Sequence, residues 1–330
     1  MLNYIDIFEE YHKQFPLIDN ILNKYFQKDE IYLGFTEYIN DFGIGDDYSF
    51  YVQTNTGKVK ITIDNFLKYI SILNPQFIVC PFEYLPPDCG KKRVVRCYKK
   101  IKTFFEEIKN VHKNNFSKQN FIIPYFLEHL EFINKNEIDF ILLNKKGILV
   151  FTENYSEISY EKILRYKAKL NNINLEMKIK SSTNDILDIL IGHEIGCEYF
   201  EVNFPFYYAE KSQSLNIEFM TFDKEKNYGN VNDIKNFNYK VNLLNLNDTN
   251  LYENNMDILT NNCNCFVCKT GYKKSYIHHL IKCKELNGTI LLSIHNIYQG
   301  KKLHEDYISF KNDNERLNFL MWFLTTQCRN

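Results

Sequence analysis

The sequence lacks any long apolar run. No stretch reaches about 18 consecutive apolar residues, so we expect no transmembrane helix. Residues 1–17 are acidic and aromatic, without the basic start and apolar run of a secretory signal, so we expect no signal peptide. Without such a signal, the nine cysteines should be reduced, and a cluster of them should bind metal rather than form disulfides. These absences indicate a soluble, cytoplasmic protein.

The chain also has few glycines and a net charge close to zero. The chain has 12 glycines in 330 residues and neither a G-x-G-x-x-G nor a G-x-x-x-x-G-K-[ST] motif, which argues against the nucleotide-binding forms of an open α/β sheet. The net charge of -1 excludes a general affinity for polyanions, so nucleic-acid binding would need a local basic patch. The run KKRVVRCYKK at 91–100 either contacts nucleic-acid phosphates or forms a solvated helix face.

Apolar side chains are abundant, and their spacing alternates between strand and helix patterns. A hydrophobic content of 45% and an aromatic content of 16% suffice for a large buried core. The predicted strands are 58–63, 76–80, 121–126, 138–143, 175–180 and 199–204, and the predicted helices are 65–75, 96–112 and 185–192, the last with Thr183 or Asn184 as its N-cap. This alternation is typical of βαβ units, and it predicts an α/β fold, a (β/α)8 TIM barrel, over residues 1–330.

Two further segments have distinct compositions. Residues 222–257 are rich in asparagine and weakly periodic, and we interpret them as a long insertion. Residues 319–328, FLMWFLTTQC, are predicted to form a terminal helix whose apolar face packs on the barrel rather than on a partner subunit.

The strongest local signal is a cysteine cluster. Cys263, Cys265 and Cys268 follow a C-x-C-x2-C pattern, which places three thiolates within one turn of chain. This spacing suits one side of a tetrahedral zinc site. The alternative is that the cysteines pack as small apolar side chains without an ion. A zinc ion would need a fourth ligand, for which His278, His279, His295 and, more weakly, Cys283 compete.

Predicted structure favours His295 as that ligand. Residues 275–286 are predicted to be a helix, in which His278 and His279 point about 100° apart, so that at most one faces the cysteines. The apolar run 289–294 is predicted to be a buried parallel strand, which would hold His295 at its carboxyl end. Four protein ligands leave no open position, so one structural Zn²⁺ per chain is expected.

The segment 263–296 resembles the zinc segment of the tRNA-guanine transglycosylases. It shares C-x-C-x2-C, Y-[IL]-H-H-L and a final I-H-N, with one extra residue between Cys268 and Tyr276. Residues 56–80 and 182–219 are also similar to segments of that family. The resemblance implies a TIM barrel with an inserted zinc-binding subdomain at about 258–300. It also implies that Cys263, Cys265, Cys268 and His295 are the ligands.

The same resemblance raises the question of catalysis. Base exchange at C1′ needs a carboxylate nucleophile and a second acid. Active members of the family take the nucleophile from an aspartate followed by a proline-threonine-arginine turn. Here Glu201 stands at the nucleophile's place, and Phe206 and Tyr207 stand where threonine and arginine would be. Glutamate is one methylene longer, and a misplacement of about 1 Å can cost a hundredfold in rate.

Other features of active members are missing. No aspartate-serine-glycine-glycine-phenylalanine-glutamine run is found, and the second acidic pair is replaced by CPFEY. The expected glycine-rich loop reads NKKGILVFTENYS, and the glycines of a later strand are replaced by KIKSST. The segments concerned are 30–55, 80–84, 143–155 and 178–183. Glu201 is therefore expected to cap a loop or to pair with Lys211 rather than to attack a sugar.

Residues 200–211 are similar instead to the non-catalytic accessory subunits of eukaryotic members. That resemblance implies a heterodimer with a catalytic paralogue that binds tRNA and exchanges guanine 34 for queuine in tRNAs with GUN anticodons. It also allows a peripheral association with the mitochondrial outer membrane. The alternatives are a divergent enzyme that uses Glu201, alone or as a homodimer, and a zinc-bearing barrel without a role on tRNA.

Overall fold

The computed structural model describes residues 32–33, 49–54, 57–73, 76–83, 85–86, 88–111, 120–133, 147–152, 158–234 and 237–329. The chain divides into two compact units. Unit 1 comprises residues 1–153 and 174–179, and unit 2 comprises residues 154–173 and 180–330. The predicted strand 138–143 lies outside the described residues, as does most of the segment 30–55.

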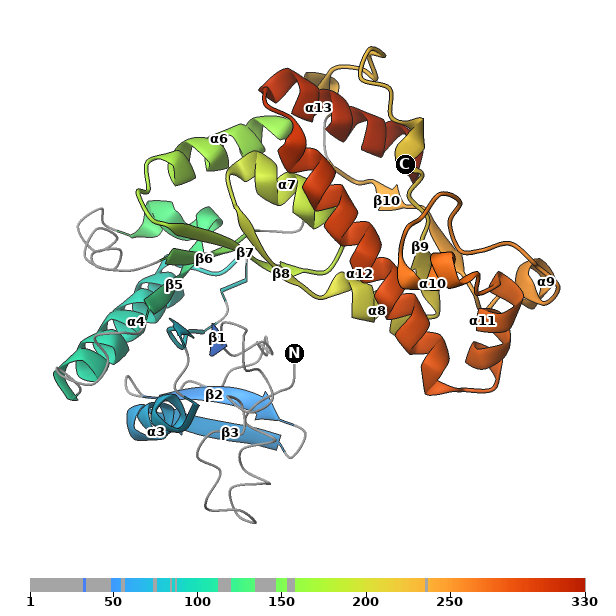
Figure 1. Ribbon diagram of the computed structural model, residues 1–330. Helices are drawn as coiled ribbons and strands as arrows, with labels where there is room; N and C mark the ends of the chain where they lie inside the picture. Colours follow the sequence, from blue (N-terminus) through green and yellow to red (C-terminus); the bar gives the residue numbers. More distant parts are fainter. Residues whose placement is uncertain are drawn as a thin grey trace. The chain divides into compact units, whose positions relative to one another are not determined.

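Unit 1 contains a parallel sheet and an antiparallel hairpin. Its elements are β1 (Tyr32–Leu33), β2 (Ser49–Thr54), β3 (Gly57–Thr62), α3 (Ile63–Leu73), β4 (Phe77–Val79), α4 (Lys91–Val111), β5 (Asn120–Phe126), the 3₁₀ helix η1 (Leu127–Phe132) and β6 (Gly147–Phe151). β1, β4, β5 and β6 are parallel neighbours in that order, while β2 and β3 form the hairpin (Figure 1). β4 and β6 consist entirely of buried residues, as expected for parallel strands that are covered on both faces.

Helix α4 contributes one apolar side to the core of unit 1. Val94, Cys97, Ile101 and Phe104 recur at intervals of three and four residues and are fully buried. Beside them, the rings of Phe126 and Phe151 stack at a centroid distance of 4.7 Å. The helix begins at Lys91, five residues before the predicted start, so the whole basic run 91–100 is helical.

Unit 2 is mainly helical. Its elements are α6 (Tyr160–Asn171), the last residues of β7 (Met177–Thr183), α7 (Leu187–Ile195), β8 (Tyr199–Val202), α8 (Phe204–Glu210), β9 (Gln213–Leu215), η3 (Phe219–Thr221), η4 (Val231–Asp233), β10 (Lys240–Val241), β11 (Leu243–Asn245), α9 (Thr249–Tyr252), α10 (Phe266–Thr270), α11 (Lys274–Lys282), α12 (Leu286–Ser309), α13 (Asp313–Trp322), the π-helical η5 (Phe323–Gln327) and β12 (Cys328–Arg329). Within unit 2, β8 is the neighbour of the last residues of β7. The predicted α/β class, with strands separated by helices, is confirmed.

Two glycines allow aromatic rings to approach the helices of unit 2 closely. A Cβ at Gly300 of α12 would lie 2.6 Å from Cζ of Phe204 in α8. A Cβ at Gly192 of α7 would lie 2.5 Å from Cε1 of Phe200 in β8. The long helix α12 therefore packs directly on α8, and this contact fixes the position of the helix that carries His295 (Figure 1).

The predicted strand 289–294 is wrong. These residues belong to α12, a helix of 24 residues that includes Asn287 and Gly288 in its first turn. Leu292, His295, Gln299 and Leu303 recur at helical spacing and are buried, so the pattern continues past the apolar run. A short apolar run fits a buried strand and a buried helix equally well, and here the following residues decide between them.

The predicted N-cap of α7 is also wrong. Ile186 occupies the cap position without a side-chain hydrogen bond. Asp188, inside the first turn, instead accepts hydrogen bonds from the backbone N–H groups of Asn184 (2.7 Å) and Asp185 (3.1 Å). A carboxylate can reach back to these donors as an N-terminal cap would.

The segment 222–257 contains η4, β10, β11 and α9, joined by turns. β11 pairs with β9, and β10 pairs with β12 near the C-terminus. Residues 319–328 continue α13 into η5, and Phe319, Trp322 and Phe323 are buried in unit 2. The boundaries of the insertion and of the subdomain at about 258–300 stay predictions.

Candidate metal centre and nucleophile region

The structure brings Cys263, Cys265, Cys268 and His295 together in unit 2. Cys265 is the N-cap of α10, Cys268 lies in that helix, and His295 lies in the middle of α12. The four ligand atoms lie within 4.8 Å of one another, and the group could hold a metal ion. The C-x-C-x2-C spacing works because a short loop and the first turn of α10 aim three sulfurs at one point.

His295 is oriented by a hydrogen bond from its far ring nitrogen. Nε2 lies 3.0 Å from the backbone oxygen of Leu215 in β9, so Nε2–H donates to that carbonyl. Nδ1 then presents its lone pair to the sulfurs, at 3.3 Å from Cys265, 3.5 Å from Cys268 and 3.9 Å from Cys263. A backbone carbonyl on the outer nitrogen is the usual partner of a metal-binding histidine.

These distances fit a tetrahedral ion. With zinc–sulfur bonds of about 2.3 Å and zinc–nitrogen bonds of about 2.05 Å, a sulfur and a nitrogen ligand lie about 3.6 Å apart. The three observed separations lie on both sides of that value. The donor set of three thiolates and one imidazole leaves no position for water or substrate, so the site suits a structural role.

The electrostatics of the cluster favour a cation. Hydrogen bonds from the thiols of Cys265 and Cys268 lower the pKa of Cys263. Burial opposes a charge on His295, yet hydrogen bonds to Cys263 and Cys265 raise the pKa of His295 to about 9. The same hydrogen bonds raise the pKa of Cys268, so negative charge gathers on the sulfur of Cys263 and stabilises a positive charge beside it.

A neighbouring residue that the sequence pattern did not indicate supports the cluster. Gln299, one turn after His295 on α12, lies with its Nε2 3.5 Å from the sulfur of Cys263 and donates to it. Its only sequence signal is its spacing of four residues from His295. The other candidate ligands lie elsewhere: His278 contacts the backbone oxygen of Leu246 at 2.6 Å, and His279 lies beside the exposed Cys283.

Glu201 lies on β8 and is engaged by the neighbouring strand β7. Ser181 donates to Oε2 of Glu201 at 3.0 Å, and the Thr183 hydroxyl donates to the backbone oxygen of Glu201. The alternative partner Lys211 lies over the ring of Tyr207, with its Nζ 3.8 Å from the ring centroid. Ser181 and Thr183, both within the segment 178–183, thus hold Glu201 in a hydrogen-bonded position.

Asp185 and Asp188 are two carboxyl groups that the sequence pattern did not indicate. Both lie close in sequence to Ser181 and Thr183, the hydrogen-bond partners of Glu201. Asp185 accepts a hydrogen bond from the hydroxyl of Tyr208 at 2.8 Å. Burial raises the pKa of both Asp185 and Asp188, that of Asp188 to about 7, although the Lys180 ammonium opposes the shift at Asp188. Their hydrogen bonds join β7, α7 and α8, a structural rather than a substrate-facing arrangement.

The acidic residue of CPFEY is also engaged within its own unit. Glu83 in unit 1 is buried, and its carboxylate lies 3.2 Å from Nζ of Lys100 and 3.4 Å from the guanidinium of Arg96. Both cations come from α4. A carboxylate neutralised in this way anchors α4 at the end of β4.

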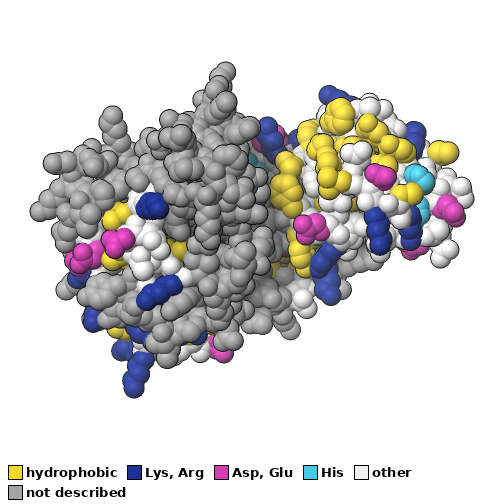
Figure 2. Space-filling view, turned by 90° about the horizontal axis from the view of Figure 1, so that it is seen from below, with side chains coloured by type: hydrophobic (Ala, Val, Ile, Leu, Met, Phe, Trp, Pro, Cys, Tyr) yellow, Lys and Arg dark blue, Asp and Glu magenta, His cyan; other side chains and the backbone are white. Residues whose placement is uncertain are grey.

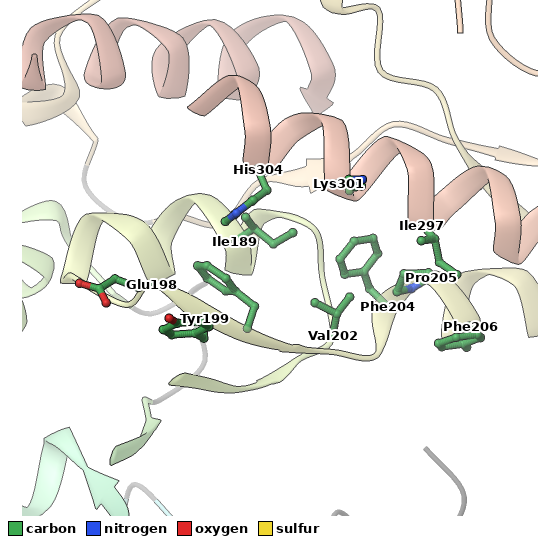
Figure 3. Close-up of a pocket in the computed structure, with 12 residues that line it drawn as sticks. Ile189, Glu198, Tyr199, Val202, Phe204, Pro205, Phe206, Ile297, Lys301 and His304 are labelled. Carbon is green, nitrogen blue, oxygen red and sulfur yellow. The ribbon is translucent and has the colours of Figure 1, made fainter. Parts of the chain in front are cut away.

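A pocket of about 370 Å³ lies between β8, α8 and α12 (Figure 3). Its walls are mostly apolar and include Val202, Phe204 and Ile297. At one end, Nδ1 of His304 lies 2.9 Å from Nε2 of His193, and burial lowers the pKa of His193 to about 3. This histidine pair is therefore neutral, and the pocket favours apolar groups.

The parallel α/β fold and the group of three cysteines and one histidine define an α/β protein with a cluster that could hold a metal ion. The family described as Queuine tRNA-ribosyltransferase matches residues 40–307. The chain therefore belongs to the queuine tRNA-ribosyltransferase family, the tRNA-guanine transglycosylases, and the resemblance found in the sequence is confirmed. Within the described part of the chain, every helix is too short or too polar to cross a bilayer.

Similarity to individual proteins extends along most of the chain. A Queuine tRNA-ribosyltransferase-like protein of Plasmodium falciparum (isolate 3D7) is 26% identical over 345 residues, covering 98% of this chain and 84% of that protein. Another protein of that description from Plasmodium falciparum is 29% identical over 233 residues, covering 67% of this chain and 95% of its own. The Queuine tRNA-ribosyltransferase of Staphylococcus haemolyticus (strain JCSC1435) is 40% identical over 68 residues, or 21% of this chain and 18% of that protein.

Proposed function

We propose that this chain is the non-catalytic subunit of a heterodimeric queuine tRNA-ribosyltransferase, comparable to accessory subunit 2. Its role is to support a catalytic partner that exchanges guanine 34 for queuine in tRNAs with GUN anticodons. The observation that carries the proposal is the surroundings of Glu201. Its carboxylate accepts a hydrogen bond from Ser181, and the following helix α8 presents Phe206 and Tyr207 where active members have threonine and arginine.

Chemistry supports this assignment. Attack on a ribose C1′ needs a carboxylate with free lone pairs at the sugar and a second acid for the departing base. Ser181 occupies part of Glu201's hydrogen-bonding capacity, and Glu83 is paired with cations of α4. The residues that remain around Glu201 thus serve packing better than base exchange.

We propose that Cys263, Cys265, Cys268 and His295 hold one structural Zn²⁺. Three thiolates and an imidazole at tetrahedral spacing suit zinc, and the site offers no open coordination position. The ion would tie the loop before α10 to α12, and Leu215 and Gln299 would orient the ligands from outside. Through α12, the metal would shape the surface that meets tRNA or a partner.

The test is incorporation of radiolabelled guanine into a tRNA with a GUN anticodon. The zinc-loaded chain is assayed alone and together with a catalytic queuine tRNA-ribosyltransferase. The proposal expects no incorporation by the chain alone and a rise when the partner is added. Glu201→Gln should leave the paired activity unchanged, as should the matched exposed control Glu198→Gln.

The second candidate is a divergent enzyme with Glu201 as its nucleophile. Its support is the position of Glu201 at the carboxyl half of β8, where a half-exposed carboxylate could meet a substrate. Incorporation by the chain alone that Glu201→Gln abolishes, while Glu198→Gln retains it, would replace the subunit proposal with this one.

A further inference from the structure

A cavity of about 450 Å³ lies beside the metal centre, within unit 2. One of its walls is a face of α12, and the others are residues 217–221 around η3 and the loop 261–264 before α10. The helix α10 packs beside α12 in this region (Figure 1). Sites for small molecules have volumes of about 300–1,000 Å³, so the cavity is large enough for one. No step of the proposed function uses it.

Gln299 is a buried side chain in the α12 wall with an unused acceptor. The residue is 1% exposed, and its Nε2 donates to the sulfur of Cys263 at 3.5 Å. Its Oε1 has no hydrogen-bond partner among the residues that the structure describes. An unpaired acceptor in a protein interior is unfavourable and rare. The cavity therefore favours a ligand that brings an N–H donor to this oxygen.

The charges that line the cavity are negative on balance. The carboxylates of Glu218 and Asp306 outnumber the ammonium of Lys302, which is the one cation among the lining residues. Lys302 is already paired with Asp306, so its charge is not available to an anionic ligand. Three thiolates around a divalent ion would add net negative charge beside Cys263. Coulomb attraction therefore favours a cation in the cavity over an anion.

Aromatic and apolar side chains line the same cavity. Tyr298 and Phe219 are half-buried, and Met220 is 81% exposed. The ring of Phe219 already attracts a cation, because Nζ of Lys302 lies 5.5 Å from its centroid. Methylene groups gain from covering such apolar surface. The cavity thus offers contacts both to an ammonium group and to the carbon chain that carries it.

The surface of unit 2 does not attract cations in general. At the right of Figure 2, the basic and acidic side chains of the described residues are interspersed, without a patch of one sign. The net charge of the whole chain is -1. Exposed charges of mixed sign are screened by salt, so a small cation would bind through the cavity rather than through the general field of the protein.

We propose that the cavity beside the metal centre binds a linear aliphatic polyamine. One primary ammonium group donates to Oε1 of Gln299, and a second pairs with the carboxylate of Glu218. The methylene chain between them lies against Tyr298 and Phe219. This proposal uses only residues of unit 2 and does not depend on the proposed function.

Isothermal titration calorimetry of the full zinc-loaded chain tests the class of ligand. The probes are putrescine and spermidine, with butylamine and the neutral diol of the same length as putrescine as controls. Putrescine should bind at least about tenfold more tightly than butylamine, because its two ammonium groups engage two separate acceptors. The diol should show no binding, because it has the same chain without the charge.

Two variants test the residues. Glu218→Gln keeps the shape of an exposed side chain and removes its charge, so the dissociation constant of putrescine should rise about tenfold. The matched control Glu225→Gln, at an exposed carboxylate outside the cavity, should leave it unchanged. Gln299→Met removes the inner acceptor at similar volume and should weaken putrescine and butylamine alike. Zinc content and circular dichroism check the fold, and Glu218→Gln decides the question if Gln299→Met loses its metal.

Absence of binding by putrescine and spermidine at millimolar concentration would overturn the proposal. So would equal affinity for putrescine and the diol, or equal effects of Glu218→Gln and Glu225→Gln. Release of zinc during the titration would assign the measured heat to chelation of the metal and would also count against the site. The guanine exchange assay contains no polyamine, so the two proposals fail separately.

Discussion

Asp188 is a carboxyl group in the interior of unit 2, held by two backbone N–H donors. Burial raises its pKa to about 7, well above the usual range of an aspartate. Because the folded state keeps this proton to a higher pH than the unfolded state, the free energy of unfolding falls as pH rises from about 4 to about 7. Above that window both states are ionised, and the full penalty of burying the charge applies.

We therefore expect Asp188→Asn to flatten the pH dependence. Between pH 6 and pH 8 the wild type should lose about 1 kcal/mol more than the variant, because an amide keeps the acceptor and has no charge to bury. Urea unfolding of both proteins at saturating zinc measures the difference, in which any pH effect on the metal site cancels. Asp233→Asn, at an exposed position, should behave like the wild type, and an equal slope in all three would contradict the assigned burial effect.

At the scale of the element, α4 combines a buried apolar side with a basic outer side. Lys91, Lys92 and Lys99 are exposed, and the first turn has no acidic residue. Cations in the first turn oppose the helix dipole and cost about 0.3–1 kcal/mol each, so helix stability does not explain them. A phosphate-binding face would use these cations, so that interpretation of the basic run stays a prediction.

The triple variant Lys91→Gln, Lys92→Gln, Lys99→Gln should weaken binding of tRNA. Each lost phosphate contact lowers the slope of log K against log salt by about one, so we expect a reduction of about three. Fluorescence anisotropy with labelled tRNA over a range of salt concentrations measures it. A matched triple at the exposed Lys224, Lys226 and Lys240 of unit 2 should leave the slope unchanged, and equal slopes for both triples would refute the role of α4.

The sequence predicted best those elements whose hydrophobic period and ending residues both lie within the element itself. β4, β5, α3 and α11 lie within a few residues of their predicted bounds, because each has a clear period and a clear end. The prediction for 289–294 failed because a six-residue segment with four apolar residues fits both a strand and a helix. The burial of Gln299 and Leu303 further along α12 decides between them.

The metal group shows the limit of local reasoning. His295 was selected for a rigid, buried position, and it has one, although on a helix instead of a strand. The carbonyl of Leu215, 80 residues away, sets its orientation, and no local pattern contains that contact. The hydrogen bonds that hold Glu201 and Asp188 likewise join separate elements, so their environments came from the structure alone.

At the scale of the whole molecule, the described residues form separate hydrophobic clusters. The metal group belongs to a cluster in unit 2, and it is remote in sequence from the cluster of unit 1. Cys265 and Cys268 pack with Leu259, Val267 and Leu292 in unit 2, whereas the sheet of unit 1 packs around Phe126 and the buried side of α4. A metal that ties α10 to α12 should therefore govern the stability of one part of the chain and leave the core of unit 1 unaffected.

Removal of the metal by a chelator should expose this difference. Without an ion, three close sulfurs must either repel one another or stay protonated, and the binding energy that stabilises the folded site is lost. Hydrogen–deuterium exchange should then rise in peptides from residues 263–299 and stay unchanged in peptides from α4. His295→Ala should reproduce the pattern without chelator, while the matched His279→Ala should not, because His279 lies on the exposed side of α11. Restored protection on adding Zn²⁺ but not Mg²⁺ would identify the ion by its preference for sulfur.

Unchanged exchange at 263–299 after verified loss of metal would mean that packing alone holds α10 against α12, and that the ion has no structural role.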